Sequence, residues 1–127
     1  MNNSAAGPTI KRFCFINRKA PYGTIYAHEM LESVLVASAF EQDVSVVFID
    51  DGVFQLKKEQ DTSSIDVKNF SPTFRALEHY DIEKIYIERE SMASRGLTID
   101  DLIIEAEVLT SEELSHIIDA QDVVLSA

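Results

Sequence analysis

The sequence predicts an α/β domain built on a five-stranded parallel sheet with helices on both faces. Short apolar segments of strand type alternate along the chain with segments whose apolar residues recur at helical spacing. Strict alternation of strand and helix favours parallel strands joined by right-handed crossovers. Several strand segments are unbroken apolar runs, as in strands buried on both faces. For five strands we predict the flavodoxin-like order 2-1-3-4-5.

The chain is long enough for one domain with a single core. It has 127 residues, and 46% of them are hydrophobic, too many for a disordered chain. We predict one domain over residues 11–127 and a disordered tail or expression remnant over residues 1–10. The first residues lack the features of a signal peptide, and no apolar run has the length of a membrane span, so we expect a cytoplasmic location.

The first half of the chain shows two strands around one long helix. Residues 11–17 hold an unbroken apolar run, typical of a buried strand. After a turn, Thr24 caps a helix of about 18 residues. Residues 44–50 form a second strand rich in β-branched residues. Residues 53–56 are expected to form one helical turn, and residues 57–69 are the longest loop.

The second half continues the alternation, with clear signals at the helix ends. Ser71 and Pro72 suit a helix cap and a first helical residue. Gly96 is the expected left-handed terminator of a short helix, and Thr110 with Glu113 predicts a capping box. The predicted elements are helices over 72–80, 90–95 and 110–121 and strands over 84–88, 102–109 and 123–127.

The net charge of −11 is unevenly distributed. Residues 1–77 hold 9 acidic and 8 basic residues, whereas residues 78–127 hold 13 acidic and 3 basic residues. This distribution disfavours direct binding of nucleic acid, because phosphate binding needs basic patches. Two interpretations of the acidic half stay open. It is either a solvated surface or a docking face for a basic partner.

The loop after the first strand is one candidate for ligand binding, because ligands in such sheets bind beyond the carboxyl ends of the strands. Within residues 18–24, Arg18 and Lys19 supply charge, and the following helix offers free N–H groups. The loop has one glycine and no Gly-rich phosphate-binding pattern, so we expect an ordinary turn and no cofactor. A nucleotide or flavin module stays an alternative. The loops at this edge are residues 18–23, 51–56, 88–92 and 107–110.

Other groups that could carry chemistry have simpler structural interpretations. Asp50 and Asp51 have the oxygen ligands that Mg²⁺ prefers, but we interpret them as turn and cap residues. The three histidines are far apart in sequence, and no Cys/His spacing is typical of zinc. Cys14 lies in mid-strand between two phenylalanines, where we expect an inert core thiol. We therefore predict no catalytic residue and no metal site.

Four aromatic or apolar residues near loops are predicted to lie at contacts with other subunits. They are Tyr22, Tyr26, Val53 and Phe54. Monomers rarely leave clusters of this kind exposed to water, so we expect some of them to be covered in an assembly.

Four segments of the chain resemble a known family. FINRKAPYGTIYAHE, VVFIDDGVFQL, KNFSPTFRALEHYDIEKIYI and SRGL are similar to the DsrF/TusC branch of the DsrE/DsrF/DsrH-like family. The similarity covers roughly residues 11–127, and the APYGT and DDGVFQL stretches are the most specific. The NRKAPYG start and the KNFSPTFRALEHYDI stretch look closer to DsrF, the intracellular sulfur oxidation form, than to TusC, the tRNA-thiolation form.

The resemblance implies a sulfur-relay role in a larger complex. Members of the family have a flavodoxin-like fold without flavin, and three homologous subunits assemble as a heterohexamer of the DsrEFH or TusBCD kind. The complex passes persulfide sulfur to a small carrier protein, DsrC or TusE. The principal persulfide cysteine belongs to the DsrE/TusD-like subunit, and the corresponding positions here, Glu88 to Ser91, hold no thiol.

The leading hypothesis is therefore a non-catalytic structural or docking subunit. Its expected partners are DsrE/TusD-like and DsrH/TusB-like subunits and a DsrC/TusE-like carrier, with sulfur oxidation favoured over tRNA thiolation. Two alternatives stay open at this point. One is a stand-alone sulfurtransferase that uses Cys14, and the other is the nucleotide or flavin module at residues 18–24.

Overall fold

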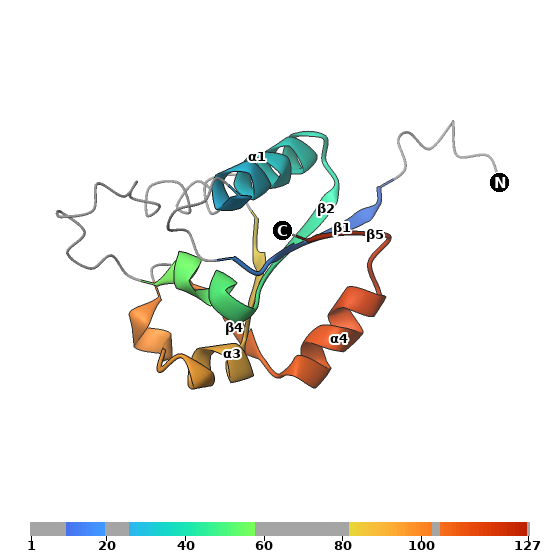
Figure 1. The fold of residues 1–127 in the computed structure, drawn as a ribbon. Helices are drawn as coiled ribbons and strands as arrows, with labels where there is room; N and C mark the ends of the chain where they lie inside the picture. The colour runs from blue at the N-terminus through green and yellow to red at the C-terminus, as the bar shows by residue number, and fades with distance from the viewer. Residues whose placement is uncertain (1–9, 20–25, 58–81, 103–104, 127) are drawn as a thin grey trace, which may run out of the picture.

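The computed structural model describes residues 10–19, 26–57, 82–102 and 105–126, which contain one five-stranded parallel sheet (Figure 1). Each adjacent pair of strands is parallel. The strands are β1 (Arg12–Asn17), β2 (Asp43–Phe48), β3 (Lys84–Glu88), β4 (Glu107–Leu109) and β5 (Val123–Ser126). The helices are α1 (Tyr26–Ala39), α3 (Arg89–Ser94) and α4 (Ser111–Asp119), with 3-10 helices η2 (Asp50–Leu56) and η3 (Ile99–Asp101). The predicted parallel sheet is confirmed.

The predicted strand order 2-1-3-4-5 is wrong, because the sheet has the order β4-β3-β2-β1-β5. β3 pairs with β2, and β5 takes the place beside β1. The chain steps in one direction from β1 through β4 and then returns once to the other side of β1. Alternation of strands and helices does not specify the side to which each crossover steps, so the sequence pattern left this open. The point where the order reverses lies between β1 and β5 rather than between β1 and β3.

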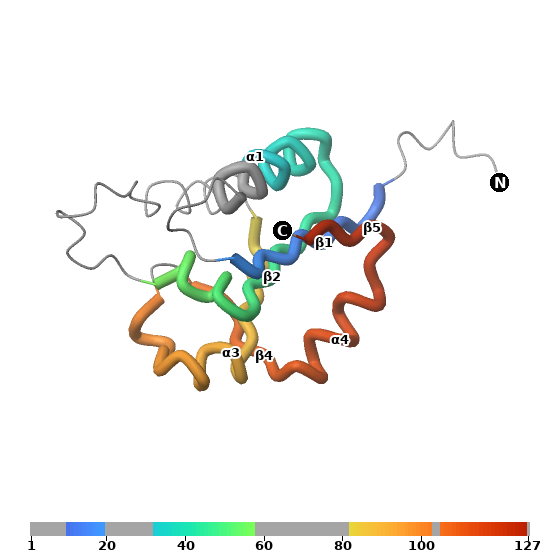
Figure 2. Tube along the Cα trace, in the orientation of Figure 1, coloured from blue at the N-terminus to red at the C-terminus, as the bar shows by residue number. Residues whose placement is uncertain are grey.

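Helices cover both faces of the sheet, as predicted, and the crossovers explain their distribution. Because crossovers between parallel strands are right-handed, connections that lead in one direction along the sheet lie on one face. The connection that leads back in the opposite direction lies on the other face. Figure 2 shows α1 and α4 on opposite sides of the twisted sheet. The alternating side chains of β1 mark the two faces, because Phe15 belongs to the core beneath α1 and Cys14 to the core beneath α4.

The larger of the two cores joins the sheet to α1, η2 and α3. Its buried members include Phe15, Phe48 and Ile87 from the strands and Val53 and Met92 from the segments that cover them. The smaller core lies against α4 and contains Cys14, Ile16, Val47, Leu109 and Leu114. Both cores are formed by residues that are distant in sequence, and the sheet lies between them.

Most predicted element bounds agree with the structure, and β4 is the main exception. The strand predicted over 102–109 begins only at Glu107. Residues 99–101 form η3, which Thr98 and Asp101 hold with a reciprocal capping box, and Leu102 follows it as the C-cap residue. The helix predicted over 72–80 and most of the loop over 57–69 lie outside the described residues.

The predicted signals at two helix ends are confirmed. The Thr110 hydroxyl accepts a hydrogen bond from the N–H of Glu113, whose carboxylate accepts one from the N–H of Thr110. These bonds satisfy N–H groups that the first turn of α4 leaves without helical partners. Gly96, just beyond α3, has a φ of 69°, the left-handed conformation expected of a helix terminator.

Candidate functional site at the carboxyl edge of the sheet

Polar residues gather where β1, β2, β3 and β4 end. Parallel strands bring their carboxyl ends to one edge, and ligands in α/β sheets bind at this edge. Arg18 follows β1, Asp50 follows β2, Glu88 ends β3, and Ser111 follows β4. The structure links these residues by hydrogen bonds and ion pairs, so the loops that the sequence singled out do meet in space.

Glu88 is the centre of this network. Its carboxylate accepts a hydrogen bond from the hydroxyl of Ser91 and another from the hydroxyl of Ser111, which lies 2.8 Å away. The Ser91 oxygen in turn accepts the backbone N–H of Asp50 at 2.8 Å. Ser91 is buried, and its hydroxyl is engaged both as donor and as acceptor. These bonds join the ends of three strands, so we assign them a structural role.

The start of α4 is held by a second carboxylate. The backbone N–H of Ser111 donates to Glu90, at 3.0 Å from Oε1 and 3.2 Å from Oε2. Hydrogen bonds from the backbone N–H groups of Glu90 itself and of Ser111 lower the pKa of the Glu90 carboxyl. A carboxylate at a helix N-terminus is stabilised by the free N–H groups there. Glu90 therefore links the start of α3 to the start of α4.

The turn after β2 packs tightly against the end of β1. Asp50 has a φ of 51°, in the left-handed region that aspartate adopts more readily than most residues. A Cβ added at Gly52 would overlap the carbonyl oxygen of Asn17, so this position requires glycine. The close approach at Gly52 supports the interpretation of Asp-Asp-Gly as a turn. The interpretation of Asp50 and Asp51 as cap residues is wrong, because both lie in the first turn of η2, whose N-cap is Ile49 without a side-chain hydrogen bond.

Both acids of this turn are paired with arginines. Asp50 Oδ2 lies 3.1 Å from Nε of Arg18, and Asp51 Oδ1 lies 2.9 Å from Nε of Arg95. Arg18 was a candidate cation for binding phosphate, but in the structure its guanidinium contacts Asp50. In the described part of the chain, no three His, Cys, Asp or Glu side chains are grouped so that they could hold a metal ion.

Cys14 lies away from this edge, in the middle of β1 beneath α4. Its side chain is completely buried, and its strand neighbours are Ser45 on β2 and Val124 on β5. Burial raises the pKa of the Cys14 thiol to about 11. A thiol with this pKa is protonated at neutral pH and is neither an accessible nor an activated nucleophile.

The four predicted interface residues have different positions. Tyr22 lies outside the described residues, and Tyr26 begins α1. Val53 requires a correction, because its side chain is completely buried in the larger core and has no surface to offer a partner. Phe54 is half-buried and packs against the same core. Interface contacts of Tyr22, Tyr26 and Phe54 stay predictions.

Sequence reasoning missed the roles of Glu90 and Ser111. Both follow predicted strands, and the capping box at Thr110 pointed to the same helix start. The contact between them depends on the pairing of β3 with β4, which brings two segments 21 residues apart to one place.

None of the helices in the described ranges combines the length and the apolar character needed to cross a bilayer.

Comparison with known proteins gives consistent matches over nearly the whole chain. The sequence profile of the DsrE/DsrF-like family matches residues 11–127. The intracellular sulfur oxidation protein DsrF of Allochromatium vinosum is 53% identical over 115 residues, which are 89% of this chain and 85% of the relative. A TusC homologue of Vibrio vulnificus is 38% identical over 109 residues, which are 86% of this chain and 92% of the relative.

Solved structures support the same fold. The ychN protein of E. coli superposes with a TM-score of 0.76 at 20% identity, covering 94% of this chain and 100% of that protein. A protein of unknown function from Methanobacterium thermoautotrophicum superposes with a TM-score of 0.64 at 13% identity, covering 92% of this chain and 99% of that protein. At these identities the likeness shows the fold alone.

Proposed function

Because the chain belongs to the DsrE/DsrF-like family, we propose that it is a non-catalytic subunit of a heterohexameric sulfur-relay complex. In this proposal it assembles with DsrE/TusD-like and DsrH/TusB-like subunits. The complex passes persulfide sulfur to a DsrC/TusE-like carrier protein. The family match and the DsrF and TusC relatives support this role.

The observation that carries the non-catalytic role is the environment of the single thiol. A persulfide forms when an accessible thiolate attacks a sulfur donor. The sequence has one cysteine, and Cys14 is completely buried with a pKa of about 11. Where the family resemblance implies the relay cysteine of a sister subunit, this chain has Glu88 and Ser91 in a closed hydrogen-bond network. The sulfur-carrying thiol of the complex would then belong to another subunit.

The pathway that we favour is sulfur oxidation rather than tRNA thiolation. Identity to the DsrF relative is 53%, against 38% to the TusC homologue, and both matches cover most of the chain. We propose that the complex is cytoplasmic, where thiols are kept reduced. Tyr22, Tyr26 and Phe54 are proposed to contribute to its subunit contacts, since aromatic residues are enriched at interfaces.

Co-expression with the two homologous subunits tests this proposal. We expect native mass spectrometry to show two copies of each subunit, and the purified complex to transfer labelled sulfur to the carrier. The Cys14→Ala complex should transfer sulfur at the wild-type rate, because Cys14 has no part in the relay. The matched control is a complex whose DsrE/TusD-like subunit lacks its cysteine, and this complex should be inactive.

Two results would contradict the proposal. A chain that stays monomeric beside both homologous subunits would exclude the structural role. Loss of transfer in the Cys14→Ala complex, with assembly retained, would instead favour the Cys14 sulfurtransferase.

A further inference from the structure

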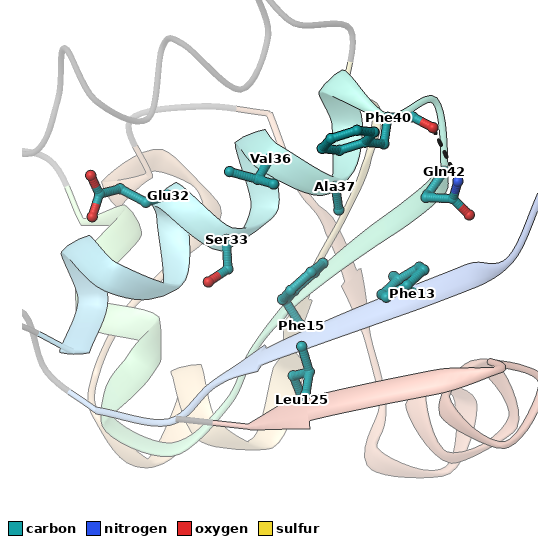
Figure 3. A pocket seen from close by; sticks show the side chains of 9 residues that line it. All are labelled: Phe13, Phe15, Glu32, Ser33, Val36, Ala37, Phe40, Gln42 and Leu125. Carbon is teal, nitrogen blue, oxygen red and sulfur yellow. Dashed lines mark hydrogen bonds between the residues drawn. The ribbon is translucent and has the colours of Figure 1, made fainter.

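An open apolar groove of about 770 Å³ runs beside α1 on one face of the sheet (Figure 3). Its floor includes Phe13 and Phe15 of β1 and Leu125 of β5, and the two phenylalanine rings are stacked with centroids 6.2 Å apart. One wall is formed by side chains of α1 and by Phe40, the residue that follows the helix. The nine described residues that line it are Phe13, Phe15, Glu32, Ser33, Val36, Ala37, Phe40, Gln42 and Leu125.

The order of the strands explains why this groove is open. The described segments that follow β1, β2 and β3, namely α1, η2 and α3, all pack into the core on the same face of the sheet. The return from β4 to β5 places α4 on the opposite face. Within the described ranges, no helix covers β5 on the face of α1. The groove therefore lies above β1 and β5, beside α1.

The groove exposes large apolar side chains to water. Val36 is 57% exposed, Phe40 is 73% exposed, and Leu125 is 45% exposed. β5 is also the last strand on this side of the sheet, so one of its edges lacks a partner strand among the described residues. Exposed apolar clusters and free sheet edges are features that proteins normally cover. Together they make this surface the strongest candidate for a contact site among the described residues.

The charge of the residues that line the groove indicates which kind of polypeptide would bind there. Among the described lining residues, Glu32 alone is charged, and no described Lys or Arg lies within ion-pair distance of it. Figure 3 shows Glu32 at one end of the groove and Phe40 at the other. Their eight-residue separation corresponds to about 12 Å along a helix. A second copy of the chain would bring together two molecules with a net charge of −11, which is unfavourable.

We infer that this groove receives an amphipathic helix of a sister subunit, with a lysine or arginine at the end that meets Glu32. The helix would lie beside α1, and its apolar residues, spaced at i, i+3 or i+4, and i+7, would pack on Phe13, Phe15 and Leu125. Its basic residue would sit about two turns from the residue that contacts Phe40. This inference rests on the proposed function, since it takes the occupant from the sulfur-relay complex.

Matched variants test the groove within the co-expressed complex. The Val36→Glu/Phe40→Glu variant places two charges in it, and we expect its affinity for the sister subunits to fall about tenfold or more. Ile99→Glu is the control, because Ile99 is similarly exposed, at 63%, but does not line the groove. Glu32→Lys should weaken binding about fivefold and change its salt dependence, whereas Glu83→Lys, with the same change in net charge, should not.

Hydrogen exchange provides a measurement that does not depend on the variants. In the wild-type complex, the second half of α1 and β5 should gain protection relative to the isolated chain, and η3 should not. Protection there supports the inference even where a groove variant fails to fold.

Three results would overturn the inference, and they separate it from the proposed function. If the groove variants bind normally and α1 gains no protection in the complex, the groove is not the contact site, but the proposed relay role is unaffected. A wild-type chain that binds no sister subunit removes both. An isolated chain that forms a dimer, dissolved by Val36→Glu/Phe40→Glu, identifies a second copy as the occupant instead.

Discussion

The hydroxyl of Ser111 donates a hydrogen bond of 2.8 Å to the carboxylate of Glu88, and this contact joins the end of β3 to the first residue of α4. Because Glu88 also accepts the hydroxyl of Ser91, one carboxylate ties together segments that begin on opposite faces of the sheet. The edge where related folds bind ligands is here occupied by the chain's own polar groups. This arrangement favours a structural role for the edge over a catalytic one.

Replacing Glu88 should destabilise the domain. Glu88→Ala removes the acceptor of two hydroxyl hydrogen bonds, and bonds to a charged group each contribute about 1.5–3 kcal/mol. Since Glu88 is only partly buried, we expect the free energy of unfolding in urea to fall by about 2 kcal/mol. Glu83→Ala, at an exposed position before the same strand, should change it by less than about 0.5 kcal/mol. Equal effects of the two variants would show that the network contributes little.

The thiol of Cys14 should be inaccessible in the native protein. Because Cys14 is completely buried and protonated, a thiol reagent should label it at a rate set by unfolding, and labelling should become fast in urea. A native protein that reacts as fast as the denatured one would contradict the burial of Cys14.

Burial of Cys14 also predicts a loss of stability at alkaline pH. The pKa of the thiol is raised from 9.0 to about 11 in the folded protein, so the unfolded chain loses its proton first. This contribution is complete below pH 9 and disappears as the pH rises through 11, at a cost of about 2–3 kcal/mol. The difference in unfolding free energy between wild type and Cys14→Ala should therefore change by this amount between pH 8 and pH 11. A constant difference would contradict the shift.

The sequence predicted the elements of the fold well and the neighbours of the strands poorly. Apolar runs and capping signals are local, so β3 over Lys84–Glu88 and the capping box at Thr110 were found where the structure has them. The place of β5 beside β1 depends on which side each crossover takes, and no local pattern encodes this. The strand predicted from Leu102 begins only at Glu107, and Leu102 instead ends the capped turn of η3.

The same distinction applies to the candidate site. Chain order and parallel pairing predicted that the loops after β1, β2 and β3 would meet, and they do. The contacts within the edge could not be predicted, since the Glu88–Ser111 bond requires the register between β3 and β4. Val53 was placed at an interface because it lies next to a loop, but η2 turns its side chain into the core.

The pKa of Glu90 should respond to a single backbone N–H. Ser111→Pro removes the donor, and proline suits this first position of α4 because the preceding residue, Thr110, is extended. NMR titration should show the pKa of Glu90 rising toward its ordinary value, but not reaching it, because the carboxylate keeps the N–H of its own residue. Ser111→Ala retains the donor and should leave a lower pKa than Ser111→Pro. Identical titrations of both variants would exclude the N–H as a cause.

Two glycines should differ in how they tolerate a methyl group. Gly52→Ala would drive its Cβ into the backbone carbonyl of Asn17, so β1 or the turn after β2 must move, and we expect a loss of about 3 kcal/mol or more in unfolding free energy. Gly96→Ala meets open space and costs only the left-handed backbone conformation, about 1 kcal/mol. Chemical denaturation of both variants under the same conditions measures the difference. If Gly96→Ala were the more damaging variant, close approach of the backbone would not be the reason for glycine at position 52.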